Sequence, residues 1–308
     1  MEFEHVSVLL QESVDWLVTD PDGIYVDCTL GGAGHSQKIA SLLSVRGRLI
    51  GIDQDEEALA AAQERLAKAD CRVDIVKANF KDLASVLSRL QVQAVNGVLF
   101  DLGVSSHQLD MAERGFSYMH DGPLDMRMDQ QTEKTAAFVV NTYSEEALAD
   151  LIWRYGEERW HKRIAQFIVL TRQKAPLTTT FQLVDVIKKA IPKGARKDGP
   201  HPAKRTFQAL RIEINDELGI LEQAVDDAIS ALVSGGRIGV ITFQSLEDRI
   251  VKQKLAQLAK GCTCPPHMPC VCDKKPVIKK PGNRLPGEEE IAKNPRARSA
   301  RLRFAEKL

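Results

Sequence analysis

The stretch Asp27-Cys28-Thr29-Leu30-Gly31-Gly32-Ala33-Gly34-His35-Ser36 decides the fold of this chain. The segment before it, Ile24-Tyr25-Val26, is apolar and β-prone, which predicts a buried parallel strand. The apolar residues between positions 39 and 43 recur at helical spacing, so the glycines lie where a strand turns into a helix. Glycine permits φ > 0 and lets a ligand approach the backbone closely. The amides at the following helix start favour an anionic group, such as a carboxylate or a phosphate.

A second strand, Leu49-Ile50-Gly51-Ile52, ends in Asp53, about twenty residues beyond the glycines. An acidic side chain at this place can accept hydrogen bonds from the ribose hydroxyls of a bound nucleoside. The alternative is that Asp53 caps the helix that begins at Glu56. Asp55 is better placed for that role, which leaves Asp53 available for a ligand.

Two further strands, Val73–Val76 and Val98–Asp101, each follow a predicted helix. Four consecutive β-α units predict an α/β fold with a doubly wound, Rossmann-like parallel sheet. Ligands bind such sheets at the carboxyl ends of the strands, near the switch in strand order. The residues at or just beyond these ends are Gly34, Asp53, Phe80 and Asp101.

The alternation of strands and helices stops after the fourth strand, and the next convincing strand is Arg237–Phe243. The intervening sequence is helical and far longer than one crossover needs, which predicts an inserted helical domain over residues 107–204. The first and second parts of the Rossmann-like domain are then 1–106 and 205–308. We also expect a helix over Asn215–Val233 that is stopped by Gly235-Gly236.

Composition limits the cellular setting and the partners. The 308 residues contain no apolar run long enough to span a bilayer and no signal peptide, so we expect a cytoplasmic protein with six reduced cysteines. The net charge is zero, but residues 188–211 hold eight Lys/Arg against one acid, and residues 261–308 hold eleven against five. Two basic zones indicate a nucleic-acid enzyme, although a charge run can also be a solvated face.

The C-terminal basic zone contains Cys262-x-Cys264 and Cys270-x-Cys272. Four thiolates could bind zinc, but the usual signature has two-residue spacers and these spacers are single residues. The alternative is a flexible loop with uncomplexed thiols. We therefore assign no metal and keep Cys262, Cys264, Cys270 and Cys272 as zinc candidates.

Several stretches resemble the RsmH (MraW) family closely, and the resemblance extends from His5 to the C-terminus. The matching motifs are DLGVSS (101–106), ERGFSY (113–118), LDMRMD (124–129), YGEE (155–158), HPAKRTFQALRI (201–212), NDEL (215–218) and ITFQSLEDR (241–249). That family methylates N4 of one decoding-centre cytosine in 16S ribosomal RNA, using S-adenosylmethionine. The resemblance thus implies a class I S-adenosylmethionine-dependent methyltransferase fold with an inserted helical domain for substrate recognition.

Residue by residue, the resemblance implies cofactor contacts at Ala33, Gly34, His35, Asp53, Phe80, Asp101 and Gln108. The turn amides can hold the methionine end of the cofactor, Asp53 the ribose diol, and Phe80 the adenine. The alternative role for Phe80 is packing in the core. The alternative for Gln108 is that of an ordinary polar loop residue. Where the family usually has His before Ser-Leu-Glu-Asp-Arg, this chain has Gln244, which argues against an obligatory proton-transfer role at that position.

A cytosine N4 amine is a poor nucleophile because its lone pair is delocalised into the ring. We expect Asp101, helped by Ser105 and Ser106 in the loop after the fourth strand, to accept a proton from N4 and to align it. The base must leave its stack, at a cost of a few kcal/mol. Phosphate contacts from Lys204, Arg205 and the C-terminal tail would offset this cost.

Other functions stay open from the sequence. A nicotinamide-dependent oxidoreductase would also use a glycine turn and Asp53, but it needs no basic zones. A non-catalytic RNA-binding module would explain the basic zones, but not four site residues at strand ends. A methyltransferase acting on another RNA is a further alternative. We expect 16S rRNA in the small ribosomal subunit as partner and no membrane, and a homodimer is one of the oligomeric states left open.

Overall fold

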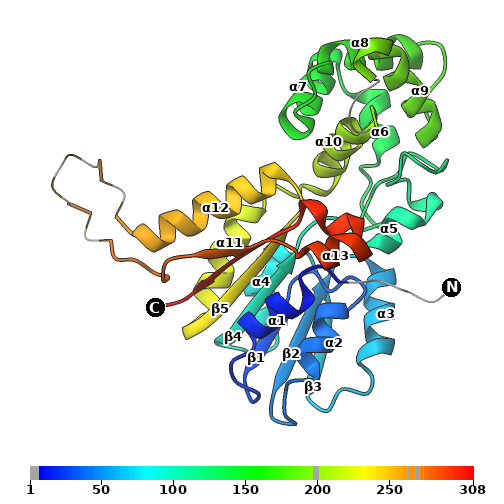
Figure 1. Cartoon of the computed structure of the whole chain (residues 1–308). Coiled ribbons are helices and arrows are strands. Elements are labelled where there is room, and N and C mark those ends of the chain that lie inside the picture. The colour runs from blue at the N-terminus through cyan, green and yellow to red at the C-terminus, as the bar shows by residue number, and fades with distance from the viewer. Residues whose placement is uncertain are drawn as a thin grey trace. The chain divides into compact units, whose positions relative to one another are not determined.

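The protein is described by a computed structural model that covers residues 7–196, 201–262, 264–265, 267, 269, 271–272 and 274–308. The chain forms two compact units (Figure 1). The first combines Met1–Gly103 with Leu218–Leu308, and the second is the single segment Val104–Glu217. Each unit has its own hydrophobic core and is described by itself below.

The first unit is built on a sheet in the order β3-β2-β1-β4-β5-β7-β6. Its strands are β1 (Ile24–Asp27), β2 (Arg48–Asp53), β3 (Arg72–Lys77), β4 (Val95–Asp101), β5 (Leu232–Thr242), β6 (Gly282–Arg284) and β7 (Arg301–Glu306). The strands from β3 to β5 pair with their neighbours in parallel. Strand β7 pairs antiparallel with β5, and β6 pairs antiparallel with β7. The strand order reverses beside β1, so β1 and β4 form the switch point at which such sheets bind ligands.

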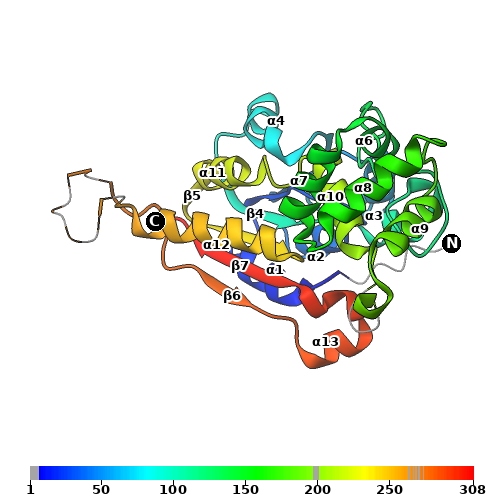
Figure 2. The ribbon, with the colours of Figure 1, turned by 90° about the horizontal axis from the view of Figure 1, so that it is seen from above.

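Side-chain alternation along the central strands gives the sheet two apolar faces. Tyr25 and Leu49 pack with α1 (Leu10–Leu17), α2 (Gly34–Ala40) and α3 (Glu56–Leu66). Val26 and Ile50 point the other way, as the period of two in a strand requires. That opposite face is covered by α4 (Leu83–Arg89), α11 (Leu221–Ala231) and α12 (Ser245–Lys260). The view from above shows α4 and α11 together on one side of the sheet (Figure 2). The remaining short elements of this unit are η1 (Phe80–Asp82), α13 (Glu288–Lys293) and η4 (Pro295–Ser299).

The predicted helix over Asn215–Val233 is wrong at both ends. Asn215 ends α10 (Lys204–Asn215), and α11 begins only at Leu221. The two glycines do not stop a helix but lie inside β5, where Gly235 has φ 78° and the register with β4 shifts between Val95 and Gly97. A glycine pair in an apolar segment marks an irregularity of a strand as readily as a helix end.

The second unit is helical. Its elements are α5 (Ser106–Asp110), η2 (Ala112–Arg114), α6 (Ala136–Thr142), α7 (Glu145–Gly156), α8 (His161–Arg172), α9 (Thr180–Ala190), η3 (Lys193–Arg196) and α10. Its core includes Phe207 and Leu210, so α10 belongs to this unit, whose bounds are wider than the predicted insertion 107–204. No helix in the described part of the chain is both long and apolar enough to cross a bilayer.

Candidate active site

The glycine turn between β1 and α2 leaves room above its backbone. Gly31 has φ 46°, and a Cβ added there would have the Thr29 carbonyl oxygen, 3.8 Å away, as its nearest neighbour. Ala33 also adopts a left-handed conformation, with φ 58°. At Gly34 the space is already taken, because an added Cβ would lie 1.9 Å from Ser7 Oγ. The turn is therefore open at Gly31 and covered by the N-terminal segment at Gly34.

Asp53 ends β2 and faces this turn. Its Oδ2 accepts a hydrogen bond from Gly31 N at 2.8 Å, and its Oδ1 accepts one from Asp55 N at 2.9 Å. Burial raises the pKa of Asp53 to about 6, against the opposing effect of these two amides. Asp55, in turn, caps α3 by accepting from Glu57 N, as the sequence predicts. The Asp53 carboxylate is thus held in place beside the open glycine.

Asp101 ends β4, one strand away from Asp53 on the other side of β1. Its amide donates to Thr29 Oγ1 at 2.5 Å, which ties the strand end to the glycine turn. The side chain is 19% exposed. Its Oδ1 is buried and has no hydrogen-bond partner among the described residues. Burial, with repulsion from Asp27 and Glu247, raises the pKa of Asp101 well above its usual range.

His35 is the immediate neighbour of this carboxyl group. Its Nδ1 lies 3.5 Å from Asp101 Oδ2, and its Nε2 lies 3.0 Å from the Val8 carbonyl oxygen. A carbonyl only accepts, so Nε2 carries the proton. Burial lowers the pKa of His35 to about 4, so the ring is neutral at pH 7 and presents the Nδ1 lone pair to Asp101. His35 therefore supplies no positive charge to offset the Asp101 carboxylate.

Sequence reasoning missed two buried acids that belong to this site. Asp27 ends β1 and accepts from Ser36 Oγ at 2.7 Å and from Thr29 N at 3.2 Å. Glu247, in the first turn of α12, is 1% exposed and accepts from Phe243 N and Gln244 N. Asp27 could have been found, because it ends a buried strand just as Asp53 and Asp101 do. Glu247 carried no comparable signal, because helix N-terminal acids are common.

Phe80 lies at the start of η1, directly after β3. Its ring meets the ring of Phe100 edge to face, with centroids 5.9 Å apart and an interplanar angle of 85°. It is partly buried against the core of the first unit. The structure therefore places Phe80 beyond a strand end and gives it a packing role, and its contact with adenine stays a prediction.

Ser105, Ser106 and Gln108 lie in the second unit, at the start of α5. Ser105 and Gln108 form a capping box, in which Ser105 Oγ accepts from Gln108 N at 3.1 Å and Gln108 Oε1 accepts from Ser105 N at 3.0 Å. These side chains thus stabilise the beginning of a short helix. Their predicted roles toward the cofactor and the cytosine stay predictions.

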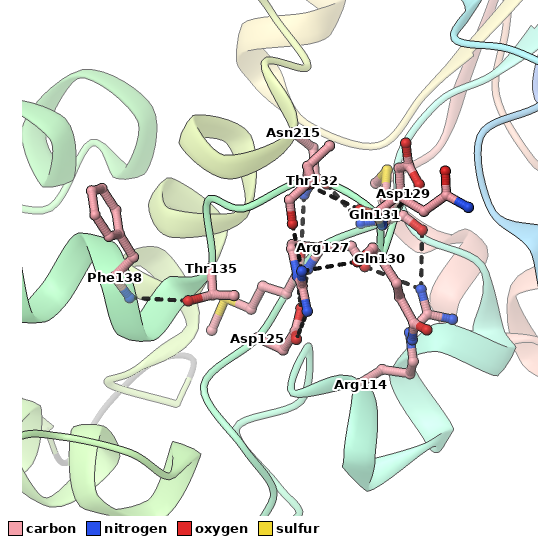
Figure 3. Close-up of polar contacts among 12 residues, drawn as sticks. Arg114, Asp125, Arg127, Asp129, Gln130, Gln131, Thr132, Thr135, Phe138 and Asn215 are labelled. Atoms are coloured by element: carbon pink, nitrogen blue, oxygen red, sulfur yellow. Dashed lines mark hydrogen bonds and ion pairs between the residues drawn. The ribbon is translucent and has the colours of Figure 1, made fainter.

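The motif residues from 113 to 129 build a polar network in the second unit (Figure 3). Arg114, 2% exposed, donates to the carbonyl oxygens of Arg127 and Met128. Arg127 in turn pairs with Asp125 through two hydrogen bonds of 2.8 and 2.6 Å. Asn215 closes the network by accepting from Met128 N and donating to the Met126 carbonyl oxygen. The structure thus gives these motifs a structural role, holding a loop whose Met126 has φ 63°.

The basic residues of the 188–211 zone differ in whether a carboxylate of the protein already pairs with them. Lys204 and Arg205 are exposed in the first turn of α10, where Arg205 donates to the Glu157 carbonyl oxygen. Arg211 instead pairs with Glu217 through two hydrogen bonds of 2.8 Å. Lys204 and Arg205 therefore remain the candidates for phosphate contacts, and Arg211 has a structural partner.

Comparison with known proteins finds the same family that the sequence motifs resemble. Residues 2–308 match the sequence model of the MraW methylase family. Two relatives named ribosomal RNA small subunit methyltransferase H, from Clostridioides difficile and Brevibacillus brevis, are 57% and 56% identical; the alignments cover all of this chain and 100% and 99% of theirs. An rRNA methylase structure from Streptococcus thermophilus is 11% identical, with a TM-score of 0.45 and 98% of each chain covered.

Proposed function

Because the chain belongs to the MraW methylase family, we propose that it methylates the N4 amine of a decoding-centre cytosine in 16S ribosomal RNA, with S-adenosylmethionine as methyl donor. The substrate class follows the names of relatives that match the whole chain at more than half identity. We further propose that the enzyme works in the cytoplasm on the small ribosomal subunit, where its RNA substrate is assembled.

The observation that carries the proposal is the group of carboxylates around the glycine turn. Asp27 and Asp53 end adjacent parallel strands, Asp101 ends the strand on the other side of Asp27, and each has a pKa raised by burial. A positively charged ligand would relieve the repulsion among these acids. S-adenosylmethionine carries positive charge on its sulfonium and ammonium groups, and its ribose hydroxyls suit Asp53.

The methyl transfer needs an acceptor for one proton. S-adenosylmethionine, with its ribose held by Asp53, would supply a methyl group that passes from its sulfur to N4, which would leave S-adenosylhomocysteine and one proton to be removed from N4. Asp101 Oδ1, which has no hydrogen-bond partner among the described residues, can accept a hydrogen bond from the amine and then its proton. Holding N4 in line with the methyl carbon can lower the barrier by roughly 7–11 kcal/mol at best.

The proposed function is tested by methyl incorporation into small subunits from a strain that lacks this gene. The purified protein is mixed with these subunits and radiolabelled S-adenosylmethionine, and the 16S RNA is digested and mapped by mass spectrometry. We expect one N4-methylcytidine in the decoding centre. Label at another base, or in another RNA, would contradict the substrate assignment. Calorimetric binding of NAD instead of S-adenosylmethionine would favour an oxidoreductase.

The affinity for S-adenosylmethionine is expected to fall as the pH drops through about 6. Asp53 has its pKa raised to about 6, so its carboxylate is ionised above that pH and protonated below it. Only the ionised form accepts two strong hydrogen bonds from the ribose. Calorimetric titration between pH 5 and 8 should therefore show a Kd that rises about tenfold per unit below the pKa.

Asp53→Asn should remove this pH dependence and weaken binding by roughly 1.5–3 kcal/mol at pH 8, the worth of a charge-assisted hydrogen bond. Asp55→Asn is the matched control, since asparagine also caps a helix. Loss of the Asp55 charge, one cause of the raised pKa of Asp53, leaves the pH dependence with a slightly lower midpoint. An unchanged Kd and profile in Asp53→Asn would refute the ribose assignment.

Lys204→Gln combined with Arg205→Gln is expected to weaken RNA binding and to reduce its salt dependence. Two lost phosphate contacts should reduce the slope of log K against log salt by about 1.4 on single-stranded RNA. The matched control is Lys162→Gln with Arg163→Gln, an exposed Lys-Arg pair in the first turn of α8 outside the basic zones. Equal slopes for the two double variants would show that Lys204 and Arg205 do not bind phosphate.

A further inference from the structure

Within the first unit, the residues at the end of α12 lie close to those around Lys275. The helix ends at Gly261, with φ 68°, and a Cβ there would lie 2.4 Å from the carbonyl carbon of Lys275. Val277 N donates to the Leu258 carbonyl oxygen at 2.9 Å, and Ile278 is 1% exposed in the core. The chain therefore returns close to the end of α12 (Figure 1) before it continues to Ile278, and the described residues between these two points, 262, 264–265, 267, 269, 271–272 and 274–276, are called the loop below.

The described residues of this loop bury little apolar surface. Val271 is 84% exposed, and Pro265, His267 and Pro269 are exposed as well. The cysteines that the structure describes here, Cys262, Cys264 and Cys272, are half-buried, and they come from the two ends of the loop. A short segment without a core needs another source of order, such as a cross-link or a metal ion.

The three sulfurs converge. The Sγ atoms of Cys262, Cys264 and Cys272 all lie within 4.8 Å of one another. Thiolates bound to one tetrahedral zinc ion at 2.3 Å are about 3.8 Å apart, so small side-chain rotations suffice to bring these sulfurs onto an ion. Val271 N also donates to Cys264 Sγ at 3.4 Å. An amide aimed at sulfur stabilises the thiolate form that zinc requires.

The single-residue spacer, which weakens the zinc signature in the sequence, is no obstacle in the structure. The Sγ atoms of Cys262 and Cys264 lie within 4.8 Å of each other, so both residues can offer their sulfurs to one point. Cys272 supplies the third sulfur from the other end of the loop. The remaining candidate, Cys270, lies outside the described residues.

We propose that Cys262, Cys264 and Cys272 bind one zinc ion, which joins the two ends of the loop. Because zinc in structural sites has four ligands, one further group completes the coordination of the ion. The site is structural: its ligands are sulfur, and it lies beyond the C-terminal end of α12. That end is about 24 Å along the helix from Ser245, since α12 has 16 residues at 1.5 Å each. The proposal is independent of which RNA the enzyme methylates.

The test is the metal content of the whole chain, purified under reducing conditions without chelator and measured by inductively coupled plasma mass spectrometry. We expect about one zinc per chain in the wild type. The variant in which Cys262, Cys264 and Cys272 are all serine should hold less than about a tenth of that amount. Cys71→Ser, a cysteine of the same unit outside the loop, is the matched control and should keep its zinc.

Cobalt gives a second readout that does not depend on the metal acquired during purification. Reduced, metal-free wild type titrated with Co²⁺ should show thiolate-to-cobalt charge-transfer absorption and the intense visible bands of a tetrahedral ion. Cys264→Ser alone should diminish the charge-transfer absorption, and unchanged S-adenosylmethionine binding would show that the variant is folded.

Three results would overturn the proposal. The first is a wild type that holds no zinc and gives no thiolate-to-cobalt absorption. The second is a triple-serine variant that retains its zinc. The third is alkylation mass mapping that finds Cys262, Cys264 or Cys272 in a disulfide in protein kept reduced throughout.

Discussion

Asp101→Asn is expected to lower the single-turnover rate of methyl transfer by about 10²–10⁴-fold at saturating S-adenosylmethionine, the contribution of a positioned acid–base group. Asparagine keeps the shape of the side chain but loses the negative charge. In the structure Asp101 Oδ1 is buried without a partner among the described residues, so its capacity to accept a hydrogen bond is unused. The measurement is methyl transfer to small subunits with enzyme in excess.

Asp53→Asn is the comparison that separates cofactor binding from proton acceptance. If Asp53 only holds the ribose, saturating cofactor restores its rate, whereas the rate of Asp101→Asn stays low. The wild-type rate should also rise with pH as Asp101 ionises, because burial raises the pKa of this carboxyl. A near-wild-type rate for Asp101→Asn would confine Asp101 to cofactor binding. The search for the acceptor would then move to Ser105, Ser106 and the Gln244-Ser245 turn.

The residues at the carboxyl ends of the parallel strands could be predicted from the sequence because the pattern that marks a strand end is local. Strands β1, β2 and β4 are short apolar runs whose last residue is an aspartate, which marks the carboxyl end, and β3 alternates apolar and polar residues. Parallel pairing then brings these ends to one edge without further information. Asp53 and Asp101 could be found in this way, and Asp27 could have been added by the same rule.

Other features depend on contacts between segments far apart in sequence. The placement of the last two strands follows from the antiparallel pairing of β7 with β5 and of β6 with β7, which no local pattern specifies. The bonds of Asn215 to residues 126 and 128 likewise join segments far apart in sequence, whereas the capping box of Ser105 and Gln108 is a local Ser-x-x-Gln pattern. Motif residues that resemblance alone would assign to binding therefore have structural partners, and function must be argued for each side chain separately.

Gly115→Ala is expected to destabilise the helical unit by about 2–5 kcal/mol. Gly115 has φ 71°, and its Cβ would lie 2.1 Å from the Pro123 carbonyl oxygen and 2.9 Å from Asp125 N. The left-handed conformation costs an alanine roughly 1–2 kcal/mol, and overpacking adds about 1–3 kcal/mol. The backbone cannot move aside easily, because the adjacent Arg114 is buried and bonded to Met128 and its neighbour.

Hydrogen exchange of the full chain measures this loss within the second unit. Amides of α6 and α9 should exchange at least about 30-fold faster in Gly115→Ala, since 1.4 kcal/mol corresponds to a factor of ten. Gly194→Ala is the matched control in the same unit: an added Cβ there meets no described residue within 4 Å, so exchange should match the wild type. Equal exchange in the two variants would mean that the turn at Gly115 relaxes without strain. The network of Arg114, Asp125 and Arg127 would then not depend on the conformation at Gly115.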